Sequence, residues 1–218
     1  MEMQIDNARW LHDGTRRDGG TRLFCIPPAG AGASSFDGWP ELLGPAVAVT
    51  AVQLPGREDR VREPAHRRLG ALLDELVPVL ADALDGPYAL FGHGMGALIA
   101  YEAARRLVAQ GAPPPRHLFV SALGAPHAAR LDRYVSRLSE PDFQLCASYE
   151  YKDGPPLPCR VTVLVGEDDD IPPLELALWR ELSTGPLRIR IIDGEHGFVV
   201  MQARQVAEVV RAGLVGVL

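Results

Sequence analysis

The sequence predicts an α/β fold built on a mostly parallel, doubly wound sheet with helices on both faces. Short apolar runs alternate with longer amphipathic segments along nearly the whole chain, which is typical of βαβ units. Turns rich in glycine and acidic residues follow several of these runs, where folds of this class bind their ligands. The chain has 218 residues, of which 47% are hydrophobic and 23% charged, so we expect one domain spanning residues 1–218.

Each element is predicted from its own pattern. Apolar runs bounded by turn residues predict strands over 22–26, 47–53, 88–91, 117–121, 160–165 and 187–192. Apolar residues three or four apart predict helices over 36–43, 69–84, 95–110, 141–149, 174–182 and 199–217. Between about 122 and 150 the alternation loosens, so this stretch is either a short cap over the sheet edge or a surface loop.

Charge and composition exclude several classes of protein. The formal net charge of -6 and the absence of a long basic run argue against binding to nucleic acid. No apolar run approaches membrane-spanning length, and the polar start of the chain is not a secretory signal. Three scattered cysteines, Cys25, Cys146 and Cys159, fit neither a disulfide framework nor a metal site. We therefore expect a cytoplasmic protein with no membrane contact, no metal and no cofactor.

The most specific motif lies at residues 91–96, Phe-Gly-His-Gly-Met-Gly, between a predicted strand and a predicted helix. This is the nucleophile elbow of an α/β-hydrolase, G-x-S-x-G, with Gly94 at the position of the catalytic serine. No cysteine in the elbow replaces the missing hydroxyl. A covalent acyl-enzyme at position 94 is therefore excluded, and His93 is expected to pack as a structural residue.

The other strand ends carry the remaining parts of such a site. Small residues at 27–34 follow the first strand, and there the backbone N–H of Ala29, together with that of Met95, would form an oxyanion hole. A run of acids at 167–170 follows the strand over 160–165, and His196 follows the last strand. This is the hydrolase order of nucleophile, acid and base, in which a carboxylate orients the imidazole.

These motifs resemble the type II thioesterases of polyketide and nonribosomal peptide pathways. The resemblance covers nearly the whole chain and rests on the elbow, on Gln-Leu-Pro-Gly-Arg at 53–57 and on Leu-Phe-Cys-Ile-Pro at 23–27. It implies an α/β-hydrolase fold with a lid, and action on acyl groups held as thioesters on the phosphopantetheine arm of an acyl or peptidyl carrier protein. It also implies that Asp169 and His196 are the acid and the base, with Ala29 and Met95 as oxyanion donors.

Three features depart from the family pattern. Gly94 stands where members carry serine, Pro28 stands where they usually carry histidine, and the lid region before Pro141 is much shorter. The substrate rule of the family therefore does not transfer directly.

Three functions remain compatible with these residues. In the first, His196 and Asp169 perform a non-hydrolytic acid/base step (cyclisation, elimination or isomerisation) on a carrier-bound or released small-molecule intermediate. In the second, His196 activates water for slow thioester hydrolysis. In the third, the protein is a non-catalytic accessory that binds a carrier protein.

Five further side chains receive predictions of their own. The cleft candidates are Tyr149, Tyr151 and His127. Each has an alternative, ordinary half-buried packing for the two tyrosines and a surface position for the histidine. Arg57 and Arg60 are expected to form structural ion pairs.

Overall fold

The computed structural model describes residues 7–13, 20–128 and 140–215. Its centre is a seven-stranded sheet with the order β1-β3-β2-β4-β5-β6-β7. Only β1 is antiparallel to its neighbour; the other pairings are parallel. This confirms the predicted α/β class. The strands are β1 (Leu11–Asp13), β2 (Thr21–Ile26), β3 (Val47–Val52), β4 (Tyr88–His93), β5 (His117–Ser121), β6 (Arg160–Gly166) and β7 (Leu187–Ile192).

The six predicted strands are all present, with ends shifted by two residues at most. The sequence did not predict β1, which pairs Leu11 with Val52 at one edge of the sheet. Three residues are too short to show an alternating pattern, so the pairing partner rather than the local sequence defines this strand.

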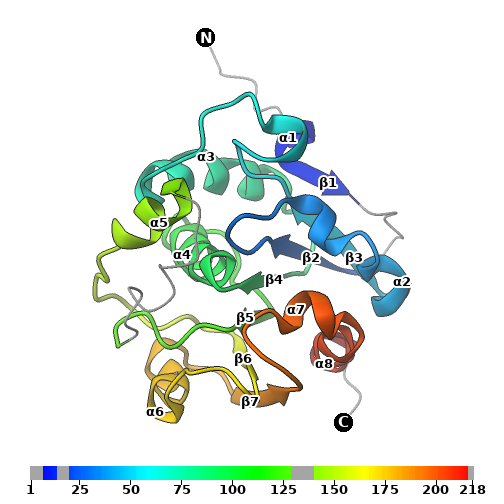
Figure 1. The fold of residues 1–218 in the computed structure, drawn as a ribbon, viewed down its shortest axis with the longest axis vertical. Helices are drawn as coiled ribbons and strands as arrows, with labels where there is room; N and C mark the ends of the chain where they lie inside the picture. Colours follow the sequence, from blue (N-terminus) through cyan, green and yellow to red (C-terminus); the bar gives the residue numbers. More distant parts are fainter. Residues whose placement is uncertain (1–6, 14–19, 129–139, 216–218) are drawn as a thin grey trace.

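Helices cover both faces of the sheet (Figure 1). On one face lie α3 (Leu69–Asp82) and α4 (Met95–Ala109), and on the other lie α2 (Trp39–Leu43) and α8 (Ala203–Val215). Successive residues of β2 alternate between two cores, because Phe24 and Ile26 join the cluster under α3 and α4 while Leu23 and Cys25 join the other. The fold is therefore doubly wound.

The remaining helices are short: those over 7–10 and 58–60 were not predicted, and the others are shortened or divided forms of predicted helices. They are α1 (Asn7–Trp10), η1 (Ala33–Phe36), η2 (Glu58–Arg60), α5 (Glu140–Ala147), α6 (Pro173–Ala177), η4 (Leu178–Leu182) and α7 (Phe198–Met201). The predicted helix over 36–43 separates into η1 and α2 at Gly38, and that over 199–217 separates into α7 and α8 at Gln202. None of the helices in the described part of the chain is long and apolar enough to cross a membrane.

The predicted cap falls partly outside the described residues, which omit 129–139. Its described end is α5, which lies against the start of α3. Ser148, just after α5, accepts a hydrogen bond from the Leu69 N–H (3.1 Å) and donates one to the Leu145 carbonyl (2.7 Å). These bonds hold the end of α5 on the same side of the sheet as α3 and α4.

Candidate active site

Gly94 forms a sharp turn between β4 and α4, with φ 54° and ψ -115°. Its N–H donates to the Ser121 carbonyl (2.8 Å), and its own carbonyl accepts the Ala97 N–H (3.0 Å). A residue with a side chain adopts this backbone region only with strain, whereas glycine tolerates it. The elbow geometry is therefore present with a glycine at its apex.

Asp169 and His196 come together from two neighbouring loops. The loops after β6 and β7 are joined by the Glu167 N–H to the Ile192 carbonyl (2.8 Å) and the Asp168 N–H to the Gly194 carbonyl (3.2 Å). Within this frame the Asp169 carboxylate lies 3.0 Å from Nδ1 of His196. The Asp169 side chain is 5% exposed and that of His196 is 40% exposed. The carboxylate is therefore buried, whereas the imidazole ring of His196 is accessible to solvent.

The other ring nitrogen of His196 faces the elbow. A Cβ built on Gly94 would lie 3.6 Å from Nε2 of His196. The hydrogen bond to Asp169 favours the tautomer with its proton on Nδ1, which leaves Nε2 as a base. Gly94, Asp169 and His196 therefore form one cluster at the C-terminal edge of the sheet.

Two backbone N–H groups, those of Ala29 and Met95, were predicted to complete the site as oxyanion donors. The first turn of α4 packs directly on the end of β2, since a Cβ on Gly96 would lie 2.3 Å from the Ile26 carbonyl oxygen and 2.5 Å from that of Pro27. This close approach places the start of α4 against the residues that begin the Ala29 loop. Within the described chain, no acceptor is found for the N–H of Ala29 or Met95.

His93, immediately before the turn, is buried and connects the elbow to the histidine loop. Its Nδ1 lies 2.8 Å from the Ser121 hydroxyl, and its ring packs edge-on against the ring of His196, with 5.3 Å between the two centroids. Burial, and to a smaller extent the nearby His196, lower the pKa of His93 to about 3. His93 is thus neutral and packed, as the sequence predicted. Its contact with the His196 ring was not predicted, and no local pattern indicates it.

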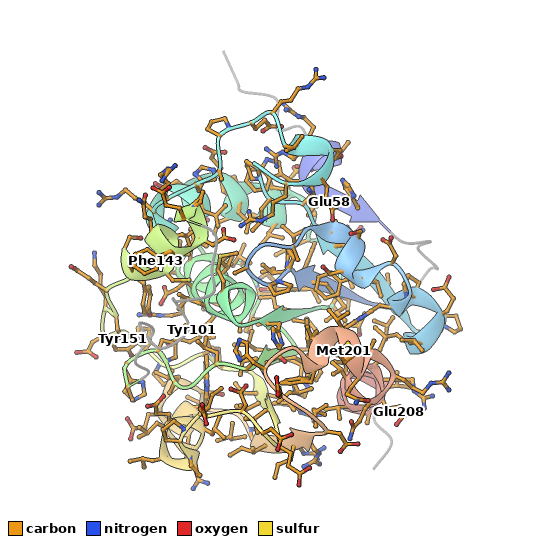
Figure 2. All side chains as sticks on the ribbon, in the orientation of Figure 1. Glu58, Tyr101, Phe143, Tyr151, Met201 and Glu208 are labelled. Atoms are coloured by element: carbon orange, nitrogen blue, oxygen red, sulfur yellow. The ribbon has the colours of Figure 1, made fainter. Side chains whose placement is uncertain are left out.

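The three cleft candidates lie along the side of α4 instead. Tyr149 donates to the Glu102 carboxylate (2.8 Å), and Glu102 lies seven residues after Met95, roughly 10 Å along the helix. Tyr151 packs near Arg105, whose guanidinium carbon is 5.6 Å from the ring centroid. Figure 2 shows Tyr151 near Tyr101 and away from Met201. Met201 is the last residue of α7, the helix that follows His196 in the sequence.

His127 belongs to this same group. Its Nε2 lies 3.1 Å from the Glu181 carboxylate, and its ring centroid lies 5.4 Å from that of Tyr151. In the described part of the chain, these contacts of Tyr149, Tyr151 and His127 are with other residues and not with His196.

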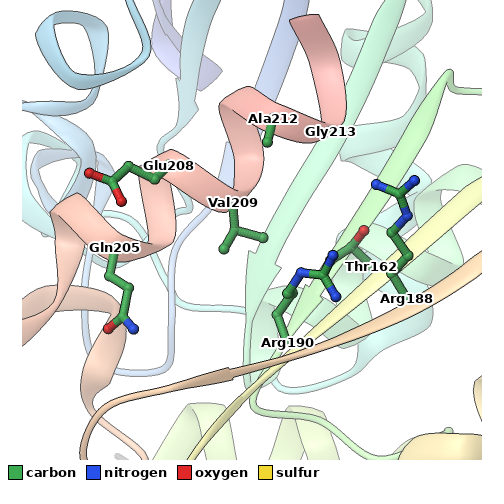
Figure 3. A pocket seen from close by; sticks show the side chains of 8 residues that line it. All are labelled: Thr162, Arg188, Arg190, Gln205, Glu208, Val209, Ala212 and Gly213. Atoms are coloured by element: carbon green, nitrogen blue, oxygen red, sulfur yellow. The ribbon is translucent and has the colours of Figure 1, made fainter. Parts of the chain in front are cut away.

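Two surface cavities lie away from the cluster. One, of about 770 Å³, is lined by α3, α4 and the segment 148–158, and includes Tyr149. The other, of about 240 Å³, lies between β7 and α8, and Figure 3 shows Arg190 of β7 on the same side of α8 as Val209. Neither lining includes Gly94, Asp169 or His196 in the described part of the molecule.

The two arginines of the 53–60 segment form ion pairs, as predicted. Arg60 pairs with Glu63 (2.7 Å), and Arg57 pairs with Asp142 on α5. The sequence did not identify Asp142, because an acid in the first turn of a helix is ordinary and its partner lies 85 residues away. The three cysteines are free and buried, and burial raises the pKa of each thiol.

Comparison with known proteins assigns the sequence to a family. The model of the thioesterase domain family matches residues 21–144, which include the elbow, the Ala29 loop and Asp142. The chain belongs to the thioesterase domain family. This family member is 28% identical to linear gramicidin dehydrogenase LgrE of Brevibacillus parabrevis, over 98% of this chain and 95% of the relative. It is 30% identical to gramicidin S biosynthesis protein GrsT of Aneurinibacillus migulanus, over 82% of each chain.

A solved structure extends the family likeness to the whole fold. The type II thioesterase BorB, from the borrelidin biosynthetic cluster, superposes with a TM-score of 0.85 at 31% identity, covering 94% of this chain and 96% of that one. The α/β-hydrolase fold and the kinship with type II thioesterases, both expected from sequence motifs, are thereby confirmed.

Proposed function

We propose that this thioesterase-family protein performs a non-hydrolytic acid/base step on a thioester or ketone intermediate of nonribosomal peptide or polyketide biosynthesis. One observation carries the proposal: Nδ1 of His196 is held by Asp169 while Nε2 faces Gly94, a residue without a hydroxyl. The site has a base and an orienting acid but no nucleophile at the elbow. The biosynthetic setting is that of the relatives GrsT and BorB.

The proposed step is proton transfer beside a carbonyl. Nε2 of His196 accepts a proton from the carbon next to the thioester or ketone carbonyl, and the C–H bonding pair moves to give an enolate. The N–H groups of Ala29 and Met95 stabilise the enolate oxygen, and Asp169 stabilises the imidazolium. The imidazolium then returns this proton in one of three ways: to the γ-carbon of an unsaturated intermediate (isomerisation), to the group that the enolate expels from the β-carbon (elimination), or to the oxygen of a second carbonyl that the enolate attacks (cyclisation).

The magnitudes favour such a step over hydrolysis. A positioned general base supplies about 10²–10⁴-fold and each oxyanion donor about 10²–10³-fold. Removal of the nucleophile from a serine triad costs on the order of 10⁶ in kcat. With Gly94 at the elbow, the residues present suit proton transfer far better than acyl transfer.

The proposed partner is an acyl or peptidyl carrier protein, which would present the intermediate on its phosphopantetheine arm. The side chain of His196 is 40% exposed, so a tethered thioester can approach the base from solvent. A released small molecule of the same chemistry would meet the same groups.

The test measures deuterium incorporation in D2O, which requires no knowledge of the natural substrate. Two probes carry the same propionyl group, one on N-acetylcysteamine and one on a carrier protein. Mass spectrometry follows exchange at the α-carbon, and a thiol reagent follows cleavage. We expect the protein to accelerate exchange by at least about 10²-fold, and His196→Ala and Asp169→Asn to remove most of this acceleration. His127→Ala is the matched control, because His127 pairs with Glu181 outside the cluster.

Three results would contradict the proposal. Exchange that survives in His196→Ala would mean that another group is the base. Thiol release that depends on His196, without exchange, would identify a water-dependent thioester hydrolase. Tight binding to the carrier protein with neither reaction would identify an accessory protein.

A further inference from the structure

Asp142 is a buried carboxylate at the start of α5, with 1% of its surface exposed. A buried charge is stable only when paired and hydrogen-bonded. One carboxylate oxygen of Asp142 forms the ion pair with Arg57, and the other accepts the N–H of Gly30 at 2.7 Å. One side chain of the cap thus binds two loops that lie 85 and 112 residues away in the sequence.

Gly30 belongs to the tight turn that carries Ala29. The Ala31 N–H donates to the Pro28 carbonyl (3.2 Å), and Gly30 has φ 76°, as the third residue of a type II turn requires. The N–H that Asp142 holds lies in the peptide plane joining Ala29 to Gly30. Only the two backbone torsions of Ala29, φ and ψ, separate this peptide plane from the Ala29 N–H. The direction of the Ala29 N–H therefore depends on the hydrogen bond between Asp142 and Gly30.

The other end of the same loop is fixed by the same partner segment. The N–H of Ala33 donates to Oε1 of Gln53 (2.6 Å), and Nε2 of Gln53 donates to the Arg57 carbonyl (2.8 Å). Gln53 is fully buried. The segment 53–57 therefore holds residue 33 directly and residue 30 through Asp142.

We infer that Asp142, held in place by Arg57, is a positioning residue that aims the Ala29 N–H at the reacting oxygen and couples the cap helix α5 to the oxyanion hole. This inference rests on the proposed function, because it assumes that Ala29 stabilises a developing negative charge. Arg57 balances the charge of Asp142, so the carboxylate can accept the Gly30 N–H without being buried as a lone anion.

The first experiment observes the turn itself and needs no activity. Amide NMR is recorded for wild type, Asp142→Asn and Asp142→Ala. We expect the Gly30 amide proton to move upfield and to exchange at least about 10-fold faster in Asp142→Ala, and the Ala29 resonance to shift with it. Asp142→Asn keeps an oxygen acceptor and is expected to fall between. Glu63→Gln, which weakens the pair with Arg60 (2.7 Å), is the matched control with unchanged resonances at 29 and 30.

The second experiment measures the consequence for the oxyanion hole, in a Gly94→Ser background. A fluorophosphonate reacts with the introduced serine: the Ser Oγ–P bond forms, the P–F bond breaks, fluoride leaves and His196 takes the hydroxyl proton. The phosphoryl oxygen occupies the oxyanion site. We expect Asp142→Ala to slow this reaction by about 10-fold or more, and the Glu63→Gln control to leave it unchanged.

The outcomes separate the two proposals. If Gly94→Ser does not react at all, the premise of the proposed function fails, and NMR still decides whether Asp142 positions the turn. If the Ala29 and Gly30 resonances are unchanged in Asp142→Ala, the positioning inference is wrong whatever the rate. If Asp142→Ala does not fold, Asp142→Asn provides the test. Loss of the ion pair with Arg57 is expected to shift the amide resonances of Ala29 and Gly30 in this variant. Unchanged resonances in Asp142→Asn would then overturn the inference.

Discussion

Replacing Gly94 by Ser puts a hydroxyl beside His196 and tests whether the surrounding groups form a working hydrolase site. The Cβ of the new residue would lie 3.6 Å from Nε2 of His196. Its Oγ is one bond further, and we expect a rotamer turned toward the ring to bring it within the roughly 2.6–3.2 Å that a nucleophile–base pair needs. Asp169 already holds the opposite ring nitrogen at 3.0 Å.

Two effects of this change have opposite signs. Loss of the nucleophile in a complete triad costs on the order of 10⁶ in kcat, so we expect Gly94→Ser to raise thioester hydrolysis by at least about 10³-fold. The backbone at φ 54°, ψ -115° disfavours a side chain by about 1–3 kcal/mol. In a protein of this size that strain corresponds to a fall in Tm of about 2–12 °C.

The assay follows thiol release from a propionyl thioester, with thermal unfolding measured on the same samples. Gly94→Ala is the matched control, because it carries the same strain without the hydroxyl. We expect both variants to lose similar stability and only Ser to gain activity, and the gain to disappear in Gly94→Ser/His196→Ala. Equal rates for the Ser and Ala variants would refute the argument that base and oxyanion donors stand ready for an oxygen at residue 94.

Three further predictions follow from contacts outside the base itself. Burial lowers the pKa of His93 from 6.5 to about 3, so the folded protein holds this ring neutral at pH values where the unfolded chain protonates it. The free energy of unfolding is therefore highest above pH 6.5 and falls toward pH 3, with a loss of about 2 kcal/mol by pH 5. In urea unfolding, His93→Gln should reduce this pH dependence by nearly one proton. Tyr149→Phe removes the bond to Glu102 (2.8 Å), which should cost about 1 kcal/mol in urea unfolding and leave deuterium exchange unchanged. The buried thiols, Cys25 among them, should resist iodoacetamide in the native protein and react in denaturant, as intact mass would show.

The sequence predicted the central sheet well because each buried strand carries its own signal. Five of the seven strands lie inside the sheet, four of them between two parallel neighbours, and such strands appear in the sequence as short apolar runs between turns. The exception, β1, has three residues and exists only through its pairing with β3. The divided helices were harder, since Gly38 and Gln202 interrupt segments whose apolar spacing continues on both sides.

For the candidate site, chain order predicted which loops would meet, and topology explains why. Parallel strands end at the same edge, so residues that follow β4, β6 and β7 come together there, and Gly94, Asp169 and His196 do. Tyr149 follows the predicted cap in the sequence, but this position did not correctly predict that its side chain would reach the cleft. After α5 the chain runs along α4, away from the elbow, and nothing in the local pattern shows which face of α4 it follows.

The elbow keeps its shape without a serine because other contacts hold it. Gly94 is fixed by its N–H to Ser121 (2.8 Å) and by its carbonyl, which accepts the N–H of Ala97 (3.0 Å) and of Leu98 (3.2 Å). Gly96 packs on the carbonyl of Ile26, so the helix cannot shift relative to β2. The strained turn is therefore a property of the sheet and of α4, and glycine at its apex removes a cost of about 1–3 kcal/mol that a serine would impose. The proposed proton transfer needs a base aimed at the elbow and no hydroxyl there, so glycine meets the needs of that proposal without the strain of a side chain.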